Sequence, residues 1–271
     1  MSEHHHGFVP PYTHPATLLP ALRQQGFALL PAADVAQLAQ CTLPDLAALG
    51  SSWDLLAPDA YLKDGGKYRK RRHASYVIGA APMQSAPPLQ GTLKAQSALQ
   101  VQSALHVQAT PHRAHWQPLE YNALHGGMQR WFEPVAATTH TDAWHALLRW
   151  MALLANQLRS PQPWYAEAHQ FRIDTEGGIG RPTPEGAHRD GVDLVAVFLV
   201  ARQGVKGGET RVFETDGPRG QRFTLTEPWS VLLLDDARVV HETTPIQPTA
   251  DGAHRDTLVL TLRAKSFQDA A

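Results

Sequence analysis

The chain has 271 residues, of which 43% are hydrophobic and 18% are charged, and its formal net charge is -1. This composition is typical of a globular chain with a sizeable core. The near-neutral charge argues against nucleic acid or an anionic membrane surface as a partner. The single cysteine, Cys41, excludes an internal disulfide and a cysteine-based zinc site, and fits a reducing compartment. No apolar run reaches about 18 residues and no signal peptide is recognisable, so we expect no membrane span and a cytoplasmic location.

Three helices are predicted in the N-terminal part of the chain. Residues 15–25 and 32–49 predict helices, the first ended by Gly26 and the second broken by Pro44. The clearest helix is expected over residues 142–159, where apolar residues recur at helical spacing.

The other N-terminal segments give weaker signals. Residues 68–79 predict a strand that carries charged and aromatic side chains. Residues 81–111 are ambiguous, and we interpret them as a variable surface segment.

After residue 164 the pattern changes to short β-branched and aromatic runs separated by Gly, Pro and Asp. Many short strands at regular spacing favour a sandwich or a barrel. We therefore predict a mainly β fold with flanking helices and a double-stranded β-helix core of the jelly-roll or cupin-like kind. The chain is expected to be one domain over 1–271, with a helical and mixed part over about 1–163 and the β-helix core over about 164–265. The expected strands of that core cover residues 167–174, 192–200, 209–214, 222–226, 229–235, 238–241 and 256–264.

A His-x-Asp motif occurs at residues 140–142, 188–190 and 254–256. Two histidines and one carboxylate on one face of Fe(II) leave three positions open for a bidentate 2-oxo acid and dioxygen. The motif suits this geometry because residues i and i+2 of a strand point to the same side. It also arises by chance, so its context must select the site.

The context selects the middle pair. The first pair opens a predicted helix, and the third has no later histidine to complete a triad. The middle pair precedes a nearly continuous apolar strand and is followed 53 residues later by His241. We therefore predict His188, Asp190 and His241 as metal ligands, with no catalytic side chain beyond them.

An arginine near the C-terminal end completes the pattern. Arg255 opens the last predicted strand, and Thr257 lies two residues further along the same face. A guanidinium binds a carboxylate through a bidentate, charge-assisted pair. Arg255 and Thr257 are thus predicted to bind the distal carboxylate of 2-oxoglutarate, and Arg263, later on the same strand, is the alternative anchor.

These motifs together resemble one family. The chain resembles the branch of 2-oxoglutarate/Fe(II) dioxygenases that includes bacterial L-isoleucine 4-hydroxylase, most strongly over about residues 165–264. The resemblance is carried by the metal motif at 184–193, a glycine turn at 207–210, the distal-histidine segment at 234–245 and the final strand at 255–259, and more weakly by Asn122, Gly126, Gly127 and Arg130.

The resemblance implies an enzyme that uses Fe(II), 2-oxoglutarate and O2. It implies hydroxylation of a free amino acid or a similar small molecule, with release of succinate and CO2. Asp190 stands where related halogenases have a small residue, which speaks against halogenation. Two alternatives stay open: a dioxygenase acting on a protein or another macromolecule, and a binding protein on the same fold without turnover.

Five residues are candidates for substrate contact. Arg172 is a candidate for a substrate carboxylate, or it pairs with an acid on the barrel surface. Glu185 is a candidate for an amino group, or it is a plain loop residue. Arg72 and Tyr76 share one face of the predicted basic strand and would close over the pocket, and Asn122 is a similar candidate. The sequence predicts no particular oligomeric state.

Overall fold

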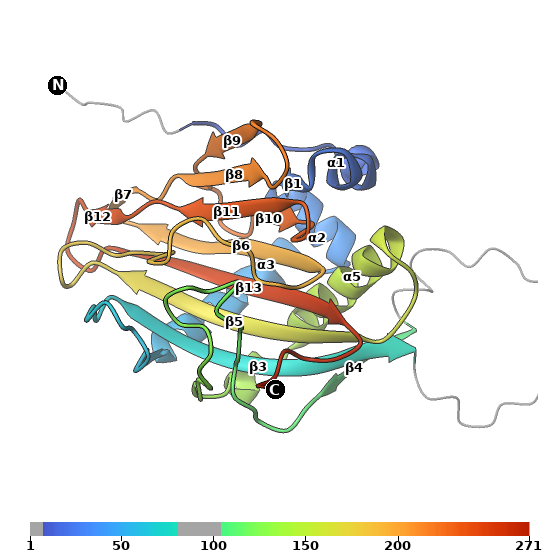
Figure 1. Cartoon of the computed structure of the whole chain (residues 1–271), viewed down its shortest axis with the longest axis horizontal. Coiled ribbons are helices and arrows are strands. Elements are labelled where there is room, and N and C mark those ends of the chain that lie inside the picture. Colours follow the sequence, from blue (N-terminus) through green and yellow to red (C-terminus); the bar gives the residue numbers. More distant parts are fainter. Residues whose placement is uncertain (1–7, 81–103, 271) are drawn as a thin grey trace, which may run out of the picture.

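The structure is a computed structural model that describes residues 8–80 and 104–270 (Figure 1). Most of the ambiguous segment 81–111 therefore lies outside the described residues. The main element is an eight-stranded sheet in which β1, β10, β6, β13, β5, β3 and β2 follow one another and β4 pairs with β3. The strands of this sheet are β1 (Phe27–Leu30), β2 (Ala57–Pro58), β3 (Arg69–Ala80), β4 (Leu105–Ala109), β5 (Trp164–Asp174), β6 (Leu194–Gln203), β10 (Val231–Leu234) and β13 (His254–Ala264).

Two smaller sheets complete the β structure. One contains β11 (Val239–Thr243), β8 (Thr210–Glu214) and β9 (Gly220–Phe223), and the other pairs β12 (Ile246–Pro248) with β7 (Val205–Gly207). Every strand pair is antiparallel. The predicted mainly β fold with a double-stranded β-helix core is confirmed.

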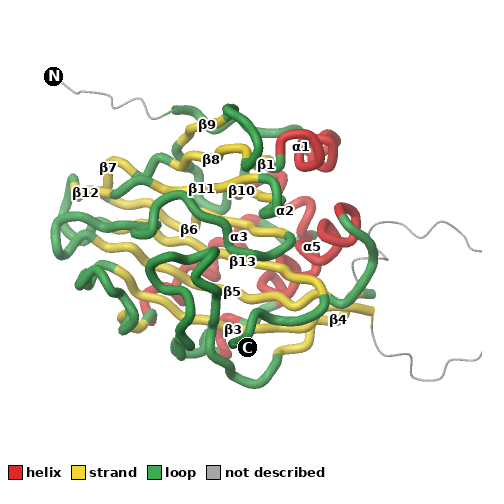
Figure 2. Tube along the Cα trace, viewed as in Figure 1, coloured by secondary structure: helices red, strands yellow, loops and turns green. Residues whose placement is uncertain are grey.

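Helices cover one face of the large sheet (Figure 2). They are α1 (Leu18–Gln25), α2 (Ala32–Ala39), α3 (Leu43–Leu49) and α5 (Asp142–Leu158), with short 3-10 turns at Pro15–Thr17, Gly50–Leu55 and Ala137–Thr139. The largest apolar core lies between these helices and the sheet. Among the described helices, none combines the length and the apolar character that a membrane span requires.

Side chains of the central strands alternate between two environments, because successive residues of a strand point to opposite faces. The apolar residues that pack against the helices have even numbers: Tyr76, Ile78, Trp164, Ala166, Ala168, Leu258, Leu260 and Leu262. The odd-numbered residues face the other side, where the smaller sheets lie and where a pocket opens. One face of the sheet therefore serves the core and the other serves the pocket.

Two features of the N-terminal part differ from the prediction. Residues 27–30 form β1, which pairs with β10 at the edge of the large sheet, although the sequence predicts no strand there. Pro44 lies in the first turn of α3, so the predicted helix 32–49 is divided before it, at residues 40–42. The large sheet also takes strands from both sides of residue 163, because β1, β2, β3 and β4 join the strands of the expected core.

Candidate metal centre

The pair His188 and Asp190 meets His241 through the backbone. The N–H of His188 donates to the carbonyl of His241 over 3.1 Å, and the N–H of His241 donates back over 2.9 Å. This isolated bridge sets the two imidazole rings 4.6 Å apart. One ligand atom of each of the three side chains lies within 4.8 Å of the others. The arrangement has the donor set and the proximity that a divalent metal ion requires.

The charges around this cluster are poorly compensated by protein groups alone. Burial raises the pKa of Asp190, although His188 acts against this shift. Burial opposes the protonation of His188, but Asp190 and Glu185 outweigh it and raise the pKa. The pKa of His241 is held well below its usual range by burial and by His188. His188 donates from Nδ1 to the Gly186 carbonyl over 3.0 Å, which leaves its Nε2 free to bind a metal.

A buried carboxylate holds the backbone that carries Asp190. Asp236 accepts hydrogen bonds from the N–H groups of Asp190, Gly191 and Val192 at 2.9, 2.8 and 3.1 Å. Gly191 adopts a left-handed conformation at φ 75°, and a Cβ there would lie 2.2 Å from the Tyr121 ring. This position therefore requires glycine. Asp236 is fully buried and was not expected at the site from the sequence.

His188, Asp190 and His241 line one pocket. Arg255 and Thr257 line the same pocket and are almost completely buried. Burial and the neighbouring Arg202 lower the pKa of Arg255 to about 10, so it stays cationic at neutral pH. Within the described residues Arg255 has no ion pair and no hydrogen-bonded side chain. Arg263, the alternative anchor, lies outside this pocket and donates to Ser266 and Phe267.

The substrate candidates separate into two groups. Asn122 and Glu185 line the pocket. Arg172, Arg72 and Tyr76 do not, because all three lie on the even-numbered, helix-facing side of their strands.

Each of these three side chains has partners elsewhere. Arg172 binds Asp256 at 2.8 and 2.9 Å and Asp54 at 3.0 Å, which is the surface alternative that the sequence left open. Arg72 pairs with Glu133, and the Tyr76 hydroxyl contacts His140 and accepts from Trp144. The expectation that Arg72 and Tyr76 close over the pocket is therefore not met, because the predicted strand presents its opposite face.

Polar residues that the sequence analysis did not select line the pocket instead. Odd-numbered positions of β3 and β5 supply Arg69, Arg71, Glu167 and His169, and the segment after β4 supplies residues 115–130, from which His115, Gln117 and Arg130 reach the pocket. The available signal was the alternation itself, because Arg69, Arg71 and His73 lie two residues apart.

Comparisons with known proteins show the family of the chain. A family model described as 2OG-Fe dioxygenase matches residues 50–261. The crystal structure of a bsmA homolog from Methylobium petroleophilum is 50% identical, covers 97% of this chain and 98% of its own, and has a TM-score of 0.84. No curated protein sequence matches the chain significantly.

Two more distant structures share the fold. The structure of IDO from Bacillus thuringiensis is 16% identical over 92% of this chain and 95% of its own, with a TM-score of 0.67. The Fe(II)/(alpha)ketoglutarate-dependent dioxygenase TqaL is 17% identical over 92% of this chain and 86% of its own, with a TM-score of 0.62. At these identities the likeness concerns the fold alone.

Proposed function

Because the chain belongs to the 2OG-Fe dioxygenase family, we propose that it hydroxylates a free amino acid or a similar small molecule, with His188, Asp190 and His241 as its iron ligands. The enzyme uses Fe(II), 2-oxoglutarate and O2, as its family does. The observation that carries the proposal is a single pocket whose lining contains both this triad and Arg255, a buried cation without an ion pair among the residues that the structure describes.

The triad fits the iron. Two imidazoles and one carboxylate with ligand atoms within 4.8 Å of each other match the facial arrangement, and a bound dication would compensate the buried Asp190. When bound, Fe(II) activates O2 in a reaction coupled to the oxidative decarboxylation of 2-oxoglutarate. The chain contributes the orientation of the ligands, which the His188–His241 bridge and Asp236 hold in place.

Arg255 and Thr257 fit the distal carboxylate of 2-oxoglutarate. The Arg255 guanidinium is buried, cationic and without a protein acceptor in the described part of the chain. Thr257 lies two residues along the same strand face and also lines the pocket, so its hydroxyl can donate a second hydrogen bond. Buried side chains make up most of the remaining wall, which suits a small substrate better than a polypeptide chain.

The test is succinate formation by the purified protein with Fe(II), 2-oxoglutarate, O2 and each of the standard L-amino acids. We expect succinate and hydroxylated product in equal amounts with at least one amino acid. His188→Ala removes a ligand and is expected to abolish iron binding and turnover. The matched control is His254→Ala, which changes the histidine of another His-x-Asp motif outside the pocket and should leave both intact.

Two results would count against the proposal. Turnover that survives His188→Ala would remove the metal assignment. A lack of response to every amino acid, from protein that does bind iron at the triad, would remove the proposed substrate class.

A further inference from the structure

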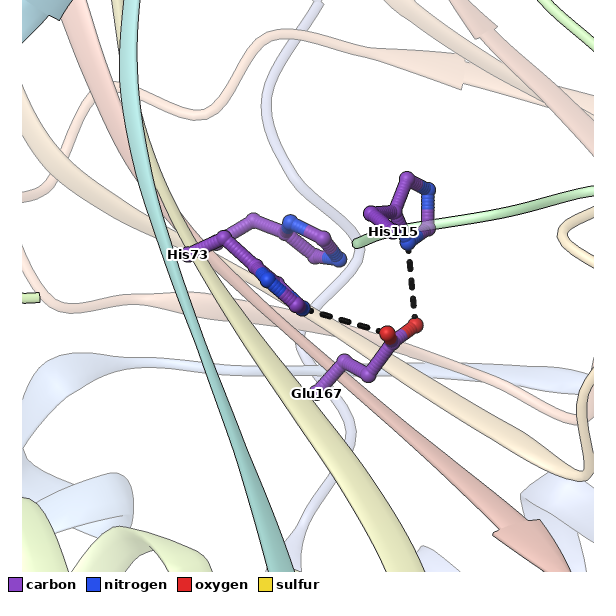
Figure 3. Close-up of side chains that lie close together, drawn as sticks. His73, His115 and Glu167 are labelled. Atoms are coloured by element: carbon purple, nitrogen blue, oxygen red, sulfur yellow. Dashed lines mark hydrogen bonds and ion pairs between the residues drawn. The ribbon is translucent and has the colours of Figure 1, made fainter. Parts of the chain in front are cut away.

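A second cluster of titratable side chains borders the pocket that contains the triad, and three of its four members line that pocket. His73 of β3, Glu167 and His169 of β5, and His115 from the segment after β4 are all buried, and one ligand atom of each lies within 4.8 Å of the others. Glu167 lies between two imidazoles (Figure 3): one carboxylate oxygen is 3.1 Å from His73 Nε2 and the other is 3.0 Å from His115 Nδ1. Gln117 donates to Asp190 over 3.3 Å and accepts from Arg130 over 2.9 Å, which links the triad to an arginine of the same pocket.

The hydrogen bonds assign a proton to each ring. A guanidinium can only donate, so Arg71, whose Nη2 lies 2.8 Å from His169 Nδ1, makes that nitrogen an acceptor. The proton of neutral His169 is therefore on Nε2. His73 and His115 donate to the ionised Glu167, so the proton of His73 is on Nε2 and that of His115 is on Nδ1.

These protonation states argue against a second metal ion. A histidine that binds a metal normally donates its other N–H to an acceptor. His169 cannot do so, because its Nδ1 already accepts from Arg71. If His73 bound a metal through Nε2, its Nδ1–H would need an acceptor, but His73 Nδ1 is buried and has no partner among the described residues. A divalent ion would also lie close to the buried guanidiniums of Arg71 and Arg130, both of which act on His115.

What the cluster offers to a ligand is a set of fixed acceptors. A carboxylate has about four acceptor sites, and the hydrogen bonds from the two imidazoles use two of those on Glu167. Arg113 Nη1 lies 3.8 Å from Glu167, an ion-pair distance, but makes no hydrogen bond to it. His115 Nε2 carries a lone pair and has no partner in the described chain. Glu167, His115 and His169 all line the pocket. A group with several N–H donors and a positive charge would satisfy these acceptors.

Guanidinium donors without an acceptor lie nearby and favour an anionic group on the same ligand. Arg69, Arg71 and Arg130 line the pocket and are buried, and Asp59 is the one carboxylate within 4.0 Å of any of them in the described residues. Each of the three guanidiniums has a buried nitrogen without an acceptor there. Asp59, Glu167 and Glu185 offset the three positive charges, but the unsatisfied guanidinium N–H groups remain, and a ligand carboxylate would accept from them.

We propose that Glu167, oriented by His73 and His115, binds the protonated amine of the substrate, and that the unsatisfied guanidinium N–H groups of Arg71 and Arg130 donate to its carboxylate. This end of the pocket would then select an α-amino acid in its zwitterionic form. The inference rests on the proposed function, because it places that substrate beside the same triad.

The experiment uses the full chain with Fe(II), 2-oxoglutarate and O2, and measures succinate formation. The probes are the standard L-amino acids and, for each one that responds, the carboxylic acid in which hydrogen replaces the amino group. We expect the KM of the amino acid to be lower by about 10- to 100-fold, as for a hydrogen bond to a charged group. Glu167→Gln should raise the KM of the amino acid by a similar factor and leave that of the amine-free acid unchanged.

Glu133→Gln is the matched control, since Glu133 pairs with Arg72 outside the pocket, and it should preserve the preference. Equal KM values for an amino acid and its amine-free analogue would overturn this inference and leave the proposed function standing. An equal rise of both KM values in Glu167→Gln would also overturn it, because the role of Glu167 would then be structural. A second equivalent of bound metal that disappears in Glu167→Gln would overturn it in favour of a metal site. No response to any amino acid would overturn both proposals.

Discussion

At the scale of single residues, some charged side chains of the pocket are buried without an ion-pair partner among the described residues. The side chain of Arg255 is only 4% exposed and lies beside another cation, Arg202, on the neighbouring strand. The two neighbouring guanidiniums repel each other, and this repulsion adds to the effect of burial in lowering the pKa of Arg255. An unpaired buried cation is unfavourable, and an anionic ligand relieves the cost when it binds.

We therefore expect Arg255→Gln to raise the KM for 2-oxoglutarate by about 30-fold or more, since truncating one partner of a buried charge pair costs that much or more. The binding of iron to the triad should change little. The measurement is the dependence of succinate formation on 2-oxoglutarate concentration. Arg263→Gln removes the same charge later on β13, outside the pocket, and should behave like the unaltered enzyme. A raised KM for 2-oxoglutarate in Arg263→Gln but not in Arg255→Gln would show that Arg263 binds the distal carboxylate instead.

At the scale of elements, the conformation of the loop that carries His188 and Asp190 depends on a residue from another segment. Residues 188–192 belong to no regular strand, so their conformation is fixed by the His241 bridge and by Asp236. Three backbone N–H groups converge on one carboxylate there. Asp235, its neighbour, points elsewhere and binds Arg159 at the end of α5.

Asp236→Ala should weaken iron binding by about 10- to 100-fold, as is typical when the support of a metal ligand is removed. An anaerobic titration with Fe(II) or Mn(II) measures this. Asp235→Ala is the control, because it removes an equally buried carboxylate; it should lower thermal stability without changing metal affinity. Unchanged affinity in Asp236→Ala would contradict a positioning role.

The elements, and the meeting of His188, Asp190 and His241 in one pocket, could be predicted from the sequence further than the rest of the pocket could. The strands of the core are recognisable by their alternation of apolar and polar residues. The spacing between His188 and His241, with Arg255 after them, restricts the choice of metal site. The face of β3 was less determined, because Arg69, Arg71 and Arg72 put charge on both sides of the strand. A register error of one residue reverses every side chain, so the predicted contacts fell on the wrong face.

β1 was missed for a different reason. Residues 27–30 are a four-residue apolar run between two helices, and so short a run has no periodicity to distinguish a strand from a helix. Only its pairing with β10 makes it a strand. Tertiary contacts of this kind are absent from local sequence patterns.

At the scale of the whole molecule, the main core and the pocket occupy opposite faces of one sheet. The core between helices and sheet contains no member of the triad. The stability of the fold should therefore not require the metal, although binding to the native state alone adds to it.

Removal of metal with a chelator should abolish succinate formation and leave the far-UV circular dichroism unchanged. Fe(II) or Mn(II) at 100 times its Kd should raise the melting temperature by roughly 5–10 °C, because mass action adds about 2.7 kcal/mol to the free energy of unfolding. A chelated protein that loses its secondary structure would show that the triad is part of the folding core.

The alternation along the central strands has a consequence for how the protein can be altered. On β3, β5 and β13 the pocket is lined by odd-numbered residues. The even-numbered residues face the side of the sheet that the helices cover, and the apolar ones among them pack against those helices. Substitutions that change ligand preference and substitutions that change stability therefore fall on alternate residues of the same strands. A library for new substrates can be confined to odd positions such as Phe171 and Val259. The interleaved positions remain available for independent stabilisation.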